Sequence, residues 1–289
     1  GTATNFDIVI KKDYIGGVIL FDETIKQKTT LGPTIPELIS KHGAIPGIKV
    51  DKGVTPFNDT EEVLTGGLEG LEDRCLEYET LGAKFTKWRA VIKIGSGLPS
   101  NECIEGNMQA LSDYAKIVQE HNMVPIVEPE ILMDGGHSIQ DSFMVTEEVL
   151  HTTFSELYLQ NVEFEGMVLK PNMVMSGYEC SEKASVDTVA EMTVTVLKRC
   201  VPSAVPGIAF LSGGQSDEDA TAHLNKMNQI LGENSPWNLT YSYGRALQAP
   251  ALKKWGGQAM NVKDAQDAFY KRAKLNSLAT HGKYDSSME

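Results

Sequence analysis

Short apolar runs of strand length alternate with amphipathic segments along most of this chain. Between the runs, apolar residues recur at helical spacing, as they do from Ile104 to Val118 and from Val186 to Leu197. Strands and helices in one unbroken alternation predict a parallel sheet, and units of this number and length predict a (β/α)8 TIM barrel of the α/β class. The runs that we interpret as strands are Ile15–Phe21, Gly47–Lys52, Lys87–Ile94, Val124–Glu130, Gly166–Lys170, Gly207–Gly214 and Asn238–Gly244.

The predicted barrel lacks one unit at its beginning. A barrel of this kind needs eight strands, and the strand still to be placed would precede Ile15. Asn5–Ile10 is the only candidate, and Lys11–Tyr14 leaves no room for a helix after it. We therefore expect a single domain over residues 1–289 whose first β-strand and helix are missing, with an atypical segment over 1–14 and a tail over 285–289.

Composition excludes several classes of partner. The chain has 289 residues and a formal net charge of −13, which disfavours binding to nucleic acid or to an anionic membrane surface. No apolar run approaches transmembrane length. The 4 cysteines have no metal-binding spacing, so we expect reduced thiols in a cytoplasmic protein without a metal or other cofactor.

Lys170 is the residue with the clearest chemical potential. It closes the apolar run that begins at Gly166, and Pro171 prevents the strand from continuing. A lysine at the end of a buried strand needs a partner or must give up its proton, and a neutral amine is a nucleophile toward carbonyl carbons. The alternative at this stage is an ordinary lysine that reaches out to solvent.

Other charged residues alternate along the neighbouring runs and therefore share one face of each strand. Lys49 and Asp51 lie on the second run, Lys87 and Arg89 on the third, and Glu128 and Glu130 on the fourth. Inside a barrel such groups must pair with one another. We expect Lys87 to activate Lys170 by charge repulsion and Glu128 to exchange protons with the pair, although solvated strand ends would show the same spacing.

The last two strand runs end in turns of small residues. The first turn contains Ser212, Gly213 and Gly214. The second contains Ser242 and Gly244 and is followed by Arg245. Glycines let backbone N–H groups approach an oxyanion, and phosphate sites in barrels often follow the last two strands. The two turns together predict phosphate binding, whereas either one alone would indicate only a tight turn.

Six motifs in this order closely resemble the class I, or Schiff-base, fructose-1,6-bisphosphate aldolases. They are GIKVDKG, KWRAVIKI, VPIVEPEIL, GMVLKPNMV, FLSGGQS and LTYSYGRALQ, and the resemblance runs from about Ile15 to Tyr284. It implies a barrel assembled as a homotetramer, a phosphosugar substrate, and metal-independent cleavage of fructose 1,6-bisphosphate to dihydroxyacetone phosphate and glyceraldehyde 3-phosphate in glycolysis or gluconeogenesis.

The resemblance also implies roles for individual residues. Lys170 would form the imine, Glu128 would move protons, and Lys87 would assist the carbinolamine step. Arg89 and Glu130 would be their charged neighbours. The C1-phosphate would bind at Ser212, Gly213, Gly214, Ser242, Gly244 and Arg245, and the other phosphate near Lys49.

Three family features have no counterpart in this sequence. The first is a first-strand segment like LAADES, whose aspartate helps take the C4 hydroxyl proton. The second is a serine and basic cluster just downstream that serves the C6-phosphate, and the third is a C-terminal tail that ends in tyrosine. An alternative function is therefore a catalytically impaired or non-catalytic barrel that binds a phosphosugar or a protein partner. A third is an imine-forming aldolase for a different sugar.

Overall fold

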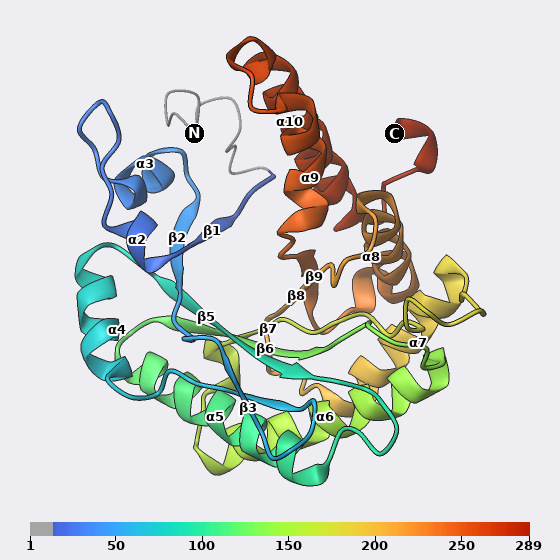
Figure 1. The fold of residues 1–289 in the computed structure, drawn as a ribbon. Helices are drawn as coiled ribbons and strands as arrows, with labels where there is room; N and C mark the ends of the chain where they lie inside the picture. The colour runs from blue at the N-terminus through green and yellow to red at the C-terminus, as the bar shows by residue number, and fades with distance from the viewer. Residues whose placement is uncertain (1–13) are drawn as a thin grey trace.

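The structure, a computed structural model, describes residues 14–289. Seven strands form one sheet in the order β1-β2-β5-β6-β7-β8-β9, and every neighbouring pair is parallel. They are β1 (Gly17–Leu20), β2 (Ile45–Lys49), β5 (Phe85–Ile92), β6 (Val124–Ile131), β7 (Val168–Leu169), β8 (Gly207–Phe210) and β9 (Asn238–Tyr241). The sheet curls and helices follow one another around its outside (Figure 1), which confirms the predicted α/β, barrel-like fold.

Each predicted strand run overlaps one of these strands, although the boundaries move. β5 begins at Phe85 rather than Lys87, because Phe85 and Thr86 already pair with the start of β6. β7 is only two residues long, shorter than the predicted run from Gly166 to Lys170. The short turn Phe164–Gly166 precedes β7, and Pro171 cannot donate a ladder hydrogen bond after it.

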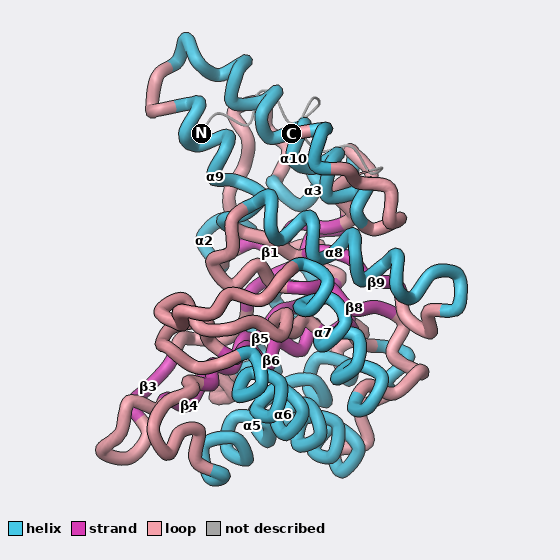
Figure 2. The backbone as a smooth tube through the Cα atoms, turned by 90° about the vertical axis from the view of Figure 1, so that its right-hand side faces the viewer, coloured by secondary structure: helices cyan, strands magenta, loops and turns pink. Residues whose placement is uncertain are grey.

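The helices lie outside the sheet, as the tube view from a second direction also shows (Figure 2). The two predicted helical segments are confirmed as α5 and α7, and Ser216 caps α8 by accepting the amide N–H of Asp219. The helices are α2 (Asp22–Ile25), α3 (Ile35–Lys41), α4 (Leu71–Thr80), α5 (Asn101–Glu120), α6 (Ile139–Leu159), α7 (Val186–Cys200), α8 (Asp217–Leu231), α9 (Arg245–Trp255) and α10 (Val262–Ala279).

A small hairpin was not predicted. β3 (Val54–Pro56) and β4 (Val63–Thr65) pair antiparallel, apart from the main sheet. Thr65 holds the hairpin against β5 and α5, because its Oγ1 donates to the carbonyl of Arg89 and its amide donates to Asn107 Oδ1. Strands of three residues are too short to show a clear alternation in the sequence.

The core fills the space between the sheet and the helices. Trp88 is fully buried and stacks on Tyr114 of α5, with 5.4 Å between the ring centroids. Because side chains alternate along a strand, the neighbours of Trp88 on β5, Lys87 and Arg89, point to the opposite face. The helix-facing side of the sheet is therefore apolar, and its inner side carries the charges.

β1 and β9 stand at the two ends of the strand order. Tyr241 of β9 donates a hydrogen bond to the carbonyl of Tyr14, just before β1, so the two ends approach each other. The candidate eighth strand, Asn5–Ile10, lies outside the described residues. Among residues 14–289, no helix is long and apolar enough to cross a membrane.

Candidate functional site

A glutamate carboxylate lies between the two lysines of the predicted site. Lys170 Nζ is 3.0 Å from Oε1 of Glu128, and Lys87 Nζ is 3.1 Å from Oε2 of the same side chain. All three residues are buried. The Lys87 contact is an ion pair without hydrogen-bond alignment, since Oε2 has no hydrogen-bond partner within residues 14–289. One carboxylate thus contacts both amines.

Asp51 extends this group on the other side of Lys87. Its Oδ2 lies 3.5 Å from Lys87 Nζ, and its Oδ1 lies 2.5 Å from Lys49 Nζ. The amide N–H of Arg89 donates to Oδ2 at 3.3 Å, which fixes the carboxylate. The result is a chain of alternating charges, Lys49, Asp51, Lys87, Glu128 and Lys170, that crosses the inner side of the sheet.

Strand register is what brings these side chains together. Lys49 is opposite Lys87 in the ladder of β2 and β5, and Arg89 is opposite Glu128 in the ladder of β5 and β6. Lys170 follows β7 directly, and its amide donates to the carbonyl of Val127 at 2.8 Å. Since parallel strands end on the same side of a sheet, residues far apart in sequence meet at that end.

Arg89 and Glu130 form a second pair beside the first. The Arg89 Nε donates to Glu130 Oε2, and the carboxylate of Glu130 is largely buried. Burial alone would lower the pKa of Arg89, but the contact with Glu130 and the charges of Glu128 and Asp51 outweigh it and raise that pKa. Arg89 is therefore a permanent cation next to the lysine group.

The first small-residue turn lies next to the end of β7, and the second lies next to the end of β8. The amide of Leu211 donates to the carbonyl of Pro171 at 3.1 Å, and the amide of Ser242 donates to the carbonyl of Phe210 at 2.8 Å. Gly213 and Gly214 have φ of +58° and +90°, a region that favours glycine. A Cβ at position 214 would lie 3.5 Å from Nη2 of Arg245, so the arginine approaches the first turn closely.

The structure thus brings every predicted site residue to the inner side or the end of adjacent strands. Gly244 caps α9 and Arg245 is its first residue, which aims the helix N-terminus toward the turns. Asp51 is the residue that the sequence reasoning left without a role. Its signal was present in the alternation of Lys49 and Asp51, but only the fold shows that Asp51 contacts Lys87.

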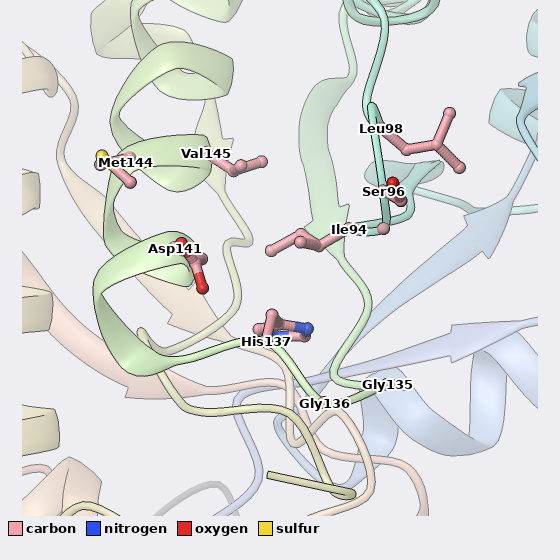
Figure 3. A pocket seen from close by; sticks show the side chains of 10 residues that line it. Ile94, Ser96, Leu98, Gly135, Gly136, His137, Asp141, Met144 and Val145 are labelled. Atoms are coloured by element: carbon pink, nitrogen blue, oxygen red, sulfur yellow. The ribbon is translucent and has the colours of Figure 1, made fainter.

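A separate cavity of about 530 Å³ lies between the segments after β5 and β6 and the first turns of α6 (Figure 3). Its lining contains none of the predicted site residues. His137 contributes its imidazole there, and burial lowers the pKa of this side chain. The remaining lining is Ile94, Gly95, Ser96, Leu98, Gly135, Gly136, Asp141, Met144 and Val145. We therefore locate the candidate active site from the cluster of charged residues around Lys170, and not from this cavity.

Comparison with known proteins identifies relatives over nearly the whole chain. The glycolytic family described as "Fructose-bisphosphate aldolase class-I" matches residues 7–289. A "Probable fructose-bisphosphate aldolase class 1" from Xanthomonas axonopodis pv. citri is 54% identical over 274 residues, covering 94% of this chain and 81% of the relative. "Fructose-bisphosphate aldolase A" from Salmo salar is 53% identical, covering 94% of this chain and 75% of the relative.

A solved structure is similar in fold as well as in sequence. It is the fructose-bisphosphate aldolase from Plasmodium falciparum, in a ternary complex with TRAP and a small-molecule inhibitor. The TM-score is 0.92 and the sequence identity 48%, over 94% of this chain and 79% of the other.

Proposed function

This chain belongs to the class-I fructose-bisphosphate aldolase family, and we propose that Lys170 is the residue that forms the imine with its ketose substrate. The chain is a lyase of glycolysis that reversibly cleaves fructose 1,6-bisphosphate to dihydroxyacetone phosphate and glyceraldehyde 3-phosphate. The observation that carries the assignment of Lys170 is its contact with Glu128, at 3.0 Å, in a buried site shared with Lys87.

Imine formation needs a nucleophile and a group that moves protons. The Lys170 nitrogen attacks C2 of the ketose, a carbinolamine forms, and loss of its hydroxyl as water leaves the imine. Glu128 is within reach of Lys170 Nζ, so its carboxylate takes the amine proton and returns a proton to the departing hydroxyl. The C4 hydroxyl then gives its proton to the regenerated Glu128 carboxylate, C4 leaves as the aldehyde of glyceraldehyde 3-phosphate, and the protonated imine accepts the electron pair of the breaking C3–C4 bond to become an enamine.

Lys87 and Asp51 keep this carboxylate in place. Glu128 is anchored from the other side by Lys87, and Lys87 is in turn held by Asp51. Fixed charges that need no rearrangement during the reaction stabilise the charge that develops on the substrate. Arg89 and Glu130 add a further fixed pair at the same end of the sheet.

The two turns supply the phosphate site in this proposal. The amides of Gly213 and Gly214 form no hydrogen bond within residues 14–289, and Arg245 stands beside them. Backbone N–H groups, a helix N-terminus and a guanidinium together favour a phosphate. Ser212, Ser242 and Gly244 complete this site, and Lys49 contacts the phosphate at the other end of the substrate.

Imine trapping tests the assignment directly. Borohydride added with dihydroxyacetone phosphate reduces an imine to a stable amine, and mass spectrometry locates the added mass. We expect it on the peptide that contains Lys170. The Lys170→Met variant should show no adduct and no cleavage, whereas a variant of an exposed lysine, Lys263→Met, should behave as the wild type. An adduct at another lysine would overturn the assignment.

We also propose an oligomeric state and a cellular location for this protein. We propose a homotetramer. Met260, Leu31 and Phe21 are apolar and 86%, 80% and 65% exposed, so they are available for contacts between subunits. Light scattering of the purified protein measures this mass. We also propose a cytoplasmic location, since a relative from Arabidopsis thaliana is named "cytosolic" and one from Pisum sativum a "cytoplasmic isozyme".

A further inference from the structure

We propose that Tyr178 is a positioning residue for substrate phosphate, because its hydroxyl fixes the peptide between Gly213 and Gly214 in the orientation that binds an oxyanion. This inference rests on the proposed phosphate site at the turn from Ser212 to Gly214. It adds a residue that reaches the site from a different loop, 35 positions earlier in the chain.

The hydroxyl of Tyr178 donates a hydrogen bond to the carbonyl of Gly213. In a planar trans peptide, the carbonyl oxygen and the following N–H point in opposite directions. Holding the Gly213 carbonyl on the side of Tyr178 therefore turns the Gly214 N–H to the other side. This amide has no hydrogen-bond partner in the described part of the chain, so it is available to an incoming oxyanion.

Glycine at position 214 makes this approach possible. A Cβ there would lie only 2.7 Å from the Tyr178 hydroxyl oxygen and 3.5 Å from Nη2 of Arg245. The tyrosine and the arginine therefore converge over a backbone position that admits no side chain. The charge of Arg245 also acts on the Tyr178 phenol, although burial dominates and raises the pKa of this tyrosine, which keeps it a donor.

Several hydrogen bonds fix the loop that carries Tyr178, so that its hydroxyl can hold the Gly213 carbonyl in place. The amide of Tyr178 donates to the carbonyl of Met133 at 2.8 Å, and the amide of Gly177 donates to the carbonyl of His137 at 2.9 Å. Lys183 Nζ donates to the carbonyls of Gly177 and Tyr178 at 2.7 and 2.8 Å. The loop after β7 is thus tied to the segment after β6, while Tyr178 as a residue is 42% exposed.

A comparison of two ketones that differ only in the phosphate group distinguishes a role of Tyr178 in phosphate binding from a purely structural role. Borohydride trapping at Lys170 is measured against the concentration of dihydroxyacetone phosphate and of dihydroxyacetone. For the wild type, the phosphorylated ketone should half-saturate at a much lower concentration. For Tyr178→Phe, that preference should shrink roughly threefold to tenfold, the effect of one hydrogen bond, with trapping of dihydroxyacetone unchanged.

Two further variants complete the test. Lys183→Met releases the loop and should reduce the preference in the same direction. Tyr158→Phe, a tyrosine with 73% exposure on α6, should leave it unchanged. A Tyr178→Phe protein with the wild-type preference, or with equal losses for both ketones, would refute the role of Tyr178. A wild type that does not distinguish the ketones would instead refute the phosphate site itself, and this inference with it.

Discussion

Lys170 directly follows β7, Glu128 lies on the adjacent parallel strand β6, and the two side chains meet at 3.0 Å with only 10% and 4% of their surface exposed. Forty-two positions of sequence separate them, from 128 to 170. A buried amine and a buried carboxylate at this distance exchange a proton readily, and the chemistry proposed for this protein depends on that exchange.

Replacing Glu128 by glutamine should slow catalysis more than it weakens binding. The amide keeps the shape of the side chain but cannot accept the proton of Lys170. We expect kcat to fall by about 10²- to 10⁴-fold, while KM changes little. Steady-state cleavage of fructose 1,6-bisphosphate gives both constants. A Glu128→Gln enzyme with nearly normal kcat would mean that another group moves the proton.

Replacing Asp51 by asparagine should reduce stability as well as activity. Asp51 contacts both Lys49 and Lys87 and is only 8% exposed. The change therefore removes a buried negative charge that pairs with both lysines. We expect the free energy of unfolding to fall by about 3 kcal/mol, measured by urea titration.

A matched variant shows whether burial is the reason for that loss. Asp267 pairs with Lys263 on the surface of α10, where 57% and 68% of the two side chains are exposed. Asp267→Asn should cost less than about 1 kcal/mol, as expected for an exposed ion pair. Equal losses for the two variants would contradict the structural importance that we give to Asp51.

His223 should make the protein sensitive to acid. Burial lowers its pKa from 6.5 to about 4, and its Nδ1 lies 2.7 Å from Gln215 Oε1. The neutral ring stabilises the fold fully above pH 6.5, and this contribution is lost as the pH falls through about 4. Between pH 7 and 4.5, His223→Gln should lose about 2–3 kcal/mol less than the wild type.

Urea unfolding at the two pH values, at one protein concentration, measures this difference. His151→Gln is the control, since His151 lies exposed on α6. It should keep the full acid dependence of the wild type. An unchanged dependence in His223→Gln would show that other groups account for the sensitivity to acid.

Replacing Gly214 by alanine should weaken phosphate binding specifically. The new Cβ would meet the Tyr178 hydroxyl at 2.7 Å, and φ at this position is +90°. We expect KM for fructose 1,6-bisphosphate to rise about tenfold or more, equivalent to at least about 1.4 kcal/mol. Gly256→Ala tests for backbone strain alone, because Gly256 has φ of +54° with open space around it. It should destabilise the fold by about 1 kcal/mol and leave KM unchanged.

Local patterns in the sequence were sufficient for the order of strands and helices. The alternation along β5 placed Lys87 and Arg89 on one face, and the helical spacing from Ile104 to Val118 predicted α5. These patterns arise within a few residues, because the side-chain periods of strands and helices are properties of the backbone itself. The hairpin of β3 and β4 was missed because its strands are too short to show such a period.

Some features of the candidate site were also predictable from local sequence, and others were not. Pro171 after an apolar run indicated where Lys170 lies, and the glycines at 213 and 214 indicated a turn whose backbone N–H groups can approach an oxyanion. The sequence predicted that Glu128 exchanges protons with the pair of Lys87 and Lys170, but not that its carboxylate lies between the two amines. The carboxylate enters between them through the register of β5 and β6. Activation of Lys170 by Lys87 stays a prediction.

The sequence by itself determined the kind of sheet, the order of its strands and the face on which the charges lie, since all of these follow from local periodicity and turn chemistry. Only the tertiary structure decided which of those charges touch. Asp51 contacts Lys87, and Tyr178 contacts Gly213, because curling of the sheet brings separate strand ends and loops to one place. Such contacts depend on the relative position of whole elements, and no short stretch of sequence contains that information.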